Sequence, residues 1–142
     1  MIQTQIITEA RSWIGTPYHY QASLKGVGCD CLGLLRGVWR AVLGTEPEDP
    51  PPYAADWAEA SGEETLRDAA RRHLTEVPIK DFSGGDVLLF RMSRSAPAKH
   101  CGIATDTEHM VHAWSGRAVT ETMLGQFWHR RVAYAFRFRS VI

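Results

Sequence analysis

The hydrophobic pattern of this 142-residue chain changes from a helical repeat to a strand repeat near residue 85. Apolar residues recur at helical spacing in residues 3–14 and 31–43, which predicts two helices that end at glycines. Helices followed by strands predict an α+β domain with an antiparallel sheet. The later apolar segments predict strands over residues 87–90, 100–105, 109–114, 118–123 and 131–138.

The remaining segments are assigned from proline content and amphipathic pattern. Residues 45–53 are rich in proline, which removes backbone donors and fixes φ, so we expect a loop. Residues 55–73 predict one or two amphipathic helices, with a candidate cap at residues 61–64. In the last strand, four alternating side chains should point to one face: Val132, Tyr134, Phe136 and Phe138.

Length and charge limit the classes of function. A chain of 142 residues fits one compact domain over residues 1–142. Sixteen basic residues balance sixteen acidic ones, so no net field attracts nucleic acid. No segment approaches the roughly 20 apolar residues that span a bilayer. Residues 1–10 lack a cationic region and a continuous apolar core, so we expect synthesis in the cytoplasm without a signal peptide.

The three cysteines are predicted to be free thiols. Cys29, Cys31 and Cys101 are odd in number, and the first two are too close to pair without strain. Cys31 follows a glycine-rich turn at residues 25–28 and begins the second predicted helix. The positive end of a helix favours thiolate, which is the nucleophilic form. Cys31 is therefore the candidate nucleophile rather than a core cysteine, and Cys29 is interpreted as a bystander.

Two histidines are candidates for the partner base. His100 begins one predicted strand and His112 lies in the next. If these strands form a hairpin, both imidazoles reach the same edge of the sheet, where one can take the thiol proton while the other fixes its ring orientation. The direction of His109 stays open. Three other histidines are predicted to be surface or structural residues: His19, His73 and His129.

The chain resembles the NlpC/P60 family of cell-wall peptidases through motifs that occur in the family's order. They are Gly15-Thr-Pro-Tyr18, Gly28-Cys-Asp30-Cys31-Leu-Gly33-Leu34-Leu, Gly85-Asp86-Val-Leu-Leu-Phe, His100-Cys-Gly102-Ile103 and His112-Ala. The resemblance implies a compact papain-like fold, in which N-terminal helices, including the nucleophile helix, pack on a central antiparallel sheet. It also implies a triad in which Cys31 is the nucleophile, His100 the base and His112 the orienting residue. This triad would cut peptidoglycan stem peptides, within the family usually at the D-γ-glutamyl–diamino acid bond, without a cofactor or metal.

Further site roles follow from the same resemblance. Tyr18 matches the family tyrosine beside the nucleophile, which binds substrate or the oxyanion, and the Cys31 N–H is a second oxyanion donor. Asp30 matches the aspartate that helps to hold a terminal amine. Leu32 stands where many members have serine, and leucine neither donates nor accepts a hydrogen bond. Recognition of a free N-terminal L-Ala is therefore not expected.

A finer resemblance concerns the setting of the protein. The Lys25–Cys31 block and the short chain resemble the family branch encoded in phage tail gene clusters and gene-transfer particles. This implies tail hub or tip proteins as partners, and a location in the tail of a virion or phage-like particle that opens the wall from the periplasm.

Three alternatives remain open at the level of sequence. Cys29, Cys31, His100 and His112 are residue types that bind zinc, although a Cys-x-Cys pair lacks the usual spacing. A papain-like domain can serve as a catalytically silent plug or hub of a tail tip. A thiol acyl-transfer enzyme shares the same triad and differs only in its substrate. The five tryptophans do not separate these alternatives.

Overall fold

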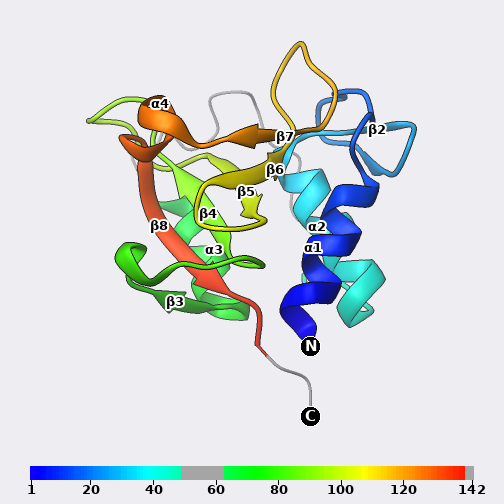
Figure 1. The fold of residues 1–142 in the computed structure, drawn as a ribbon, viewed down its shortest axis with the longest axis horizontal. Helices are drawn as coiled ribbons and strands as arrows, with labels where there is room; N and C mark the ends of the chain where they lie inside the picture. Colours follow the sequence, from blue (N-terminus) through cyan, green and yellow to red (C-terminus); the bar gives the residue numbers. More distant parts are fainter. Residues whose placement is uncertain (49–62, 140–142) are drawn as a thin grey trace.

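The computed structural model describes residues 1–48 and 63–139, in which three helices precede a six-stranded sheet and a fourth lies between its last two strands in the sequence (Figure 1). The helices are α1 (Ile2–Ser12), α2 (Cys31–Leu43), α3 (Thr65–His73) and α4 (Gly125–His129), with a 3-10 turn η1 (Ile79–Asp81). A small two-stranded sheet contains β1 (Ser23–Leu24) and β2 (Gly28–Cys29). The large sheet contains β3 (Thr75–Val77), β4 (Val87–Phe90), β5 (His100–Ala104), β6 (His109–His112), β7 (Thr120–Met123) and β8 (Val132–Arg137).

The large sheet is antiparallel throughout and has the strand order β3-β8-β4-β5-β6-β7. Helices α1 and α2 lie side by side, and both contact β5 near the middle of the sheet (Figure 1). The predicted α+β class, with helices packed on a central antiparallel sheet, is confirmed. All five predicted strands are present, although most end one or two residues earlier than predicted.

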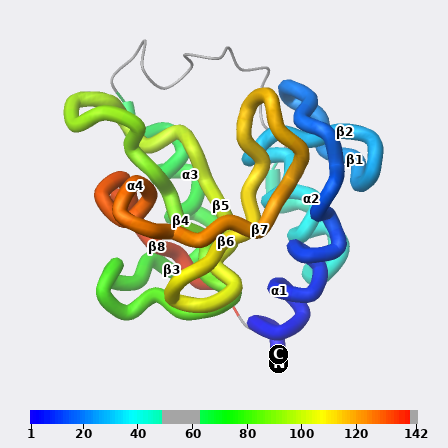
Figure 2. Tube along the Cα trace, turned by 45° about the horizontal axis from the view of Figure 1, so that its top comes forward, coloured from blue at the N-terminus to red at the C-terminus, as the bar shows by residue number. Residues whose placement is uncertain are grey.

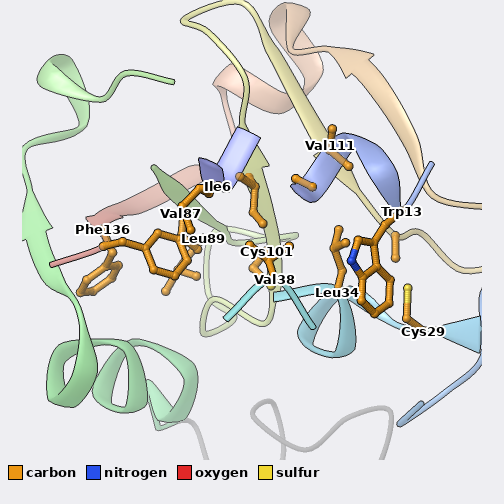
Figure 3. Close-up of a cluster of buried hydrophobic side chains, with 14 of the residues drawn as sticks. Ile6, Trp13, Cys29, Leu34, Val38, Val87, Leu89, Cys101, Val111 and Phe136 are labelled. Atoms are coloured by element: carbon orange, nitrogen blue, oxygen red, sulfur yellow. The ribbon is translucent and has the colours of Figure 1, made fainter. Parts of the chain in front are cut away.

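Strand β4 is buried along its whole length because both faces of the sheet are covered. On one face, Val87 and Leu89 join a cluster packed against α1 and α2, which we call the helix-side cluster (Figure 3). On the other face, Leu88 and Phe90 join the α4-side cluster, which also contains Trp128. This two-sided burial explains why the sequence of β4 is a continuous apolar run rather than an alternating one.

The predicted alternation of the last strand is wrong at one position. Tyr134 and Phe136 pack on the helix-side cluster as predicted, but Val132 packs on the α4-side cluster. The cause is a bulge in β8: Leu89 pairs with Tyr134, whereas the next residue Phe90 pairs with Val132. The extra residue in β8 shifts the side-chain alternation by one position.

Several sequence predictions can be compared with the structure only in part. Residues 49–62, which include most of the proline-rich segment and the candidate cap, lie outside the described residues. Within the predicted 55–73 helical region, the described part forms α3. The short elements β1, β2, β3, η1 and α4 were not predicted from the pattern. Among residues 1–48 and 63–139, no helix is long and apolar enough to cross a membrane.

The loop between β6 and β7 is tied to the segment that follows α1. The Gly15 N–H donates to the Val119 carbonyl at 2.9 Å, and the Val119 N–H donates to the Thr16 carbonyl at 2.9 Å. Figure 2 shows this loop beside the region of β1 and β2. The loop therefore joins the strand that carries His112 to the segment that carries Tyr18.

The Gly84-Gly85-Asp86 turn before β4 has a structural role. The Asp86 side chain is fully buried, and its carboxylate accepts two hydrogen bonds from the Arg137 guanidinium, each of 2.9 Å. The Ser83 N–H donates to the same carboxylate at 2.9 Å. Asp86 therefore joins the start of β4 to the end of β8.

We predict that Asp86→Ala lowers the free energy of unfolding by about 2 kcal/mol, because it removes the buried carboxylate that accepts hydrogen bonds from Arg137 and from the Ser83 N–H. Urea denaturation measures this change. Arg72→Ala is the control, since it breaks an exposed ion pair with Glu48 and should cost less than about 1 kcal/mol. Equal losses in the two variants would contradict the structural role of Asp86.

Candidate active site

The start of α2 is held by the carboxylate of Asp30. One oxygen, Oδ1, accepts a hydrogen bond from the Gly33 N–H at 2.7 Å, which caps the helix. The other oxygen, Oδ2, accepts from the Gln21 N–H at 2.8 Å, in the segment before β1. The Asp30 side chain is buried, so these bonds fix α2 to begin at Cys31, as predicted.

Gly33 allows α2 to approach the β1 segment closely. A Cβ atom at this position would lie only 1.8 Å from the Ala22 carbonyl oxygen, which is part of the backbone. Any side chain would therefore force the first turn of α2 away from β1. The glycine of the Asp-Cys-x-Gly motif is thus required by packing around the first turn, two residues after Cys31.

The thiol of Cys31 is half-buried between α2 and β5. Its Sγ lies 3.9 Å from the Lys99 carbonyl oxygen, at the residue that precedes β5. A hydrogen bond from the Cys101 thiol, and after it the His100 imidazole, hold the pKa of Cys31 well below its ordinary value, although burial acts in the opposite direction. The structure therefore favours the thiolate form of Cys31.

His100 and His112 come together from adjacent strands, and the predicted hairpin is confirmed. The Nε2 atom of His100 lies 2.9 Å from Nδ1 of His112. The Nε2 atom of His112 lies 3.3 Å from Oγ1 of Thr122 on β7. If the Nε2–H of His112 donates to Thr122, its Nδ1 accepts a hydrogen bond from the Nε2–H of His100. Cys31, His100, His112 and Thr122 then form one hydrogen-bonded line.

Aromatic rings enclose the two imidazoles. The ring centroid of His100 lies 4.7 Å from that of Trp114 and 5.4 Å from that of Trp128. The ring of His112 lies 5.1 Å from Trp128. Burial, followed by the charge of His100, lowers the pKa of His112 to about 3, so His112 is neutral near pH 7.

Tyr18 and Cys29 lie next to the nucleophile on a short parallel bridge between them. Burial, followed by the charge of Cys31, raises the pKa of Tyr18 to about 12, so the phenol keeps its proton. Cys29 is fully buried, and burial raises the pKa of its thiol to about 12. Tyr18 can therefore donate a hydrogen bond near Cys31, whereas Cys29 stays a neutral thiol.

The side chains of the other histidines lie on the surface or in exposed ion pairs. His109 lies 3.0 Å from Asp106, and His73 lies 2.7 Å from Glu48. His19 and His129 are exposed. Among the residues that the structure describes, no three His, Cys, Asp or Glu side chains form a group that could hold a metal ion.

Sequence reasoning missed several residues around the site. Trp114 follows His112 by two positions, a spacing that places both side chains on one face of an extended segment, so that signal was available. Trp128, Thr122 and Cys101 carry no such local signal. Their positions beside the histidines and Cys31 depend on how α4, β7 and β5 pack.

Comparisons with known proteins agree with this fold. The model of the NlpC/P60 family matches residues 15–137, and the chain belongs to that family of peptidoglycan hydrolases. Gamma-DL-glutamyl hydrolase of Bacillus subtilis (strain 168) is 26% identical over 137 residues, which are 96% of this chain and 29% of that protein. The chain thus spans less than a third of that relative.

Solved structures show the same fold. The NlpC/p60 domain of the peptidoglycan hydrolase SagA is 23% identical, with a TM-score of 0.66 over 96% of this chain and 98% of that one. An NlpC/P60 family protein from Bacillus cereus ATCC 10987 is 18% identical, with a TM-score of 0.68 over 96% of this chain and 40% of that one. Members of this family are cysteine peptidases or hydrolases.

The burial of His112 predicts a pH dependence of stability. Its folded-state pKa of about 3 lies below the ordinary value of 6.5, so the unfolded chain binds a proton first as the pH falls. Stability is therefore lost below about pH 6.5. Between about pH 7 and pH 5, wild type should lose about 2 kcal/mol more than His112→Asn in urea denaturation.

His129→Asn is the matched control, since it removes an exposed histidine. It should show the same loss of stability as wild type over this pH range. If His112→Asn also follows wild type, His112 is not buried as a neutral imidazole.

Proposed function

We propose that this protein is a cysteine endopeptidase that hydrolyses peptidoglycan stem peptides with Cys31, His100 and His112. The observation that carries the proposal is the contact of 2.9 Å between His100 Nε2 and His112 Nδ1, beside a thiol at the start of α2. Cys31, His100 and His112 would thus supply a nucleophile, a base and an orienting group, which together perform acyl transfer.

The proposed reaction has two acyl-transfer steps. His100 takes the proton of Cys31, and the thiolate attacks the carbonyl carbon of the scissile bond. His100 then protonates the leaving amine, which departs as the C–N bond breaks and leaves a thioester on Cys31. His100 next removes a proton from water, and hydroxide attack on the thioester releases the acid and restores the Cys31 thiol.

The oxyanion formed in each step needs hydrogen-bond donors. The backbone N–H of Cys31 belongs to the first turn of α2, where amides have no partner within the helix and the dipole is positive. The Tyr18 phenol keeps its proton near Cys31 and is the proposed second donor. His112 stays neutral near pH 7, so it orients His100 as a hydrogen-bond acceptor rather than as a negative charge.

The bond that we propose is the one between D-γ-glutamyl and a diamino acid. A relative named gamma-DL-glutamyl hydrolase supports this choice. Both oxygens of Asp30 accept backbone N–H groups, and Leu32 has no polar group. These features favour cleavage within the stem peptide over recognition of a free N-terminal L-Ala.

We further propose that a phage tail or a related particle delivers the protein to the wall. The support is the resemblance of the Lys25–Cys31 block to that branch of the family. Mass spectrometry of purified particles tests the proposal. We expect this chain among the tail proteins, and its absence from intact particles would contradict the delivery route.

Digestion of purified peptidoglycan tests the peptidase activity. Wild type should release stem-peptide fragments, and their masses should identify the bond that is cut. Cys31→Ala should release none, because the acyl-enzyme cannot form. Cys29→Ala is the matched control, since it removes a buried thiol two residues away and should keep activity within about threefold of wild type.

Two results would contradict the peptidase proposal. If wild type releases nothing while folded, a catalytically silent plug or hub becomes the better explanation. If Cys31→Ala releases the same fragments as wild type, Cys31 is not the nucleophile. Transfer of the acyl group to an added amine without hydrolysis would favour the thiol acyl-transfer alternative.

A further inference from the structure

The Cys101 thiol has no part in the mechanism above, although it lies against the nucleophile. Cys101 follows His100 on β5, and its side chain is 1% exposed. Successive side chains of a strand point to opposite faces. His100 accordingly contacts the rings on the α4 side, and Cys101 belongs to the helix-side cluster, where Figure 3 shows it near Val38 of α2.

The Cys101 thiol lies beside two acceptors on one residue. Its Sγ donates to the Cys31 carbonyl oxygen at 3.3 Å, and a hydrogen bond from its side chain is the first cause that lowers the pKa of the Cys31 thiol. The carbonyl of Cys31 is neutral and already belongs to the hydrogen-bond ladder of α2. A thiolate carries a full charge, and hydrogen bonds to charged acceptors are the stronger ones. When Cys31 ionises, rotation of the Cys101 S–H toward the thiolate is therefore favoured.

We propose that Cys101 is a positioning residue for the nucleophile: its thiol donates a hydrogen bond to the Cys31 thiolate and holds Cys31 in its reactive form. This inference rests on the proposed role of Cys31 as nucleophile. It assigns a function to a position that the acyl-transfer mechanism leaves unused.

The other titratable groups around Cys31 are compatible with a hydrogen-bond donor at Cys101. His100 stabilises the thiolate by hydrogen bond and charge. Asp30 is a negative neighbour whose charge acts on the pKa of Cys101, Cys29 and Tyr18 alike. Cys29 and Tyr18 have pKa values of about 12 and stay neutral.

Cys101 itself remains protonated while Cys31 ionises. Its hydrogen bond to Cys31, followed by burial, raises the pKa of Cys101 well above the ordinary value. Of the two neighbouring cysteines, Cys31 is therefore the thiolate and Cys101 is the protonated thiol that can donate to it. A donor role for Cys101 requires these two protonation states.

The rate at which iodoacetamide alkylates Cys31 tests the proposal without any peptide substrate, because only the thiolate reacts. We would measure the rate from about pH 4 to about pH 9, with peptide mass spectrometry to count label on Cys31 alone. Cys101→Ala and Cys101→Val remove the donor and should raise the pH midpoint by about one unit. Cys101→Ser restores a donor and should return the midpoint toward wild type.

Cys29→Ala is the matched control: it removes another buried thiol near Cys31 and should leave the midpoint unchanged. Valine and serine preserve the approximate size of the side chain, so the test does not depend on the alanine variant alone. A wild-type midpoint in both Cys101→Ala and Cys101→Val would overturn the role of Cys101. A shift in Cys101→Ser as large as that in Cys101→Ala would overturn it too.

The assay separates this inference from the proposed function. If wild-type Cys31 reacts like an ordinary thiol, with a midpoint of about 8.5, the proposed nucleophile fails and the role of Cys101 fails with it. If wild type has a low midpoint and the Cys101 variants share it, the nucleophile stands and only the role of Cys101 is lost.

Discussion

The buried carboxylate of Asp30 is the interaction on which the site depends. It accepts N–H groups from Gly33 in the first turn of α2 and from Gln21 before β1, so it joins the helix to the loop that precedes it. Gly33 lets these segments touch at a distance that no other residue allows. Cys31 is the next residue after Asp30, so the hydrogen bonds of Asp30 that begin the helix also fix the position of the Cys31 thiol. They leave the Cys31 N–H at the positive end of the helix.

The two faces of β5 provide different environments to the same thiol. On one face, His100 lies among His112, Trp114 and Trp128, where the exclusion of water keeps His112 neutral near pH 7. On the other face, Cys101 lies in the helix-side cluster, together with side chains of α2. The alternation of a strand thus brings an imidazole and a thiol to Cys31 from consecutive residues. Both act on the ionisation of Cys31, the imidazole through a hydrogen bond and its charge, and the thiol through a hydrogen bond.

Much of the fold followed from local pattern. The helix over residues 31–43 was predicted with its observed bounds, because the Gly-rich turn, Asp30 and Gly44 mark its ends within a few residues. The face of the sheet on which Val132 lies was predicted wrongly, because the bulge in β8 depends on pairing with β4. Strands β1, β2 and β3 have two or three residues each, which is too short for a periodic signal. The predicted role of Asp30 toward substrate remains a prediction, and its cap role was readable from its place before the helix.

By itself, the sequence determined the order of the elements, the start of α2 at Cys31 and the family to which the motifs point. The order of the elements and the start of α2 follow from hydrophobic periodicity and from groups a few residues apart, whereas the family follows from the resemblance of the motifs. Only the tertiary structure decided that Cys101, 70 residues from Cys31 along the chain, lies against it, and that Trp128 and Thr122 flank His112. The physical reason is that hydrogen bonding and burial depend on contacts between distant segments. The charge states of the cysteine and histidine side chains depend in turn on those contacts.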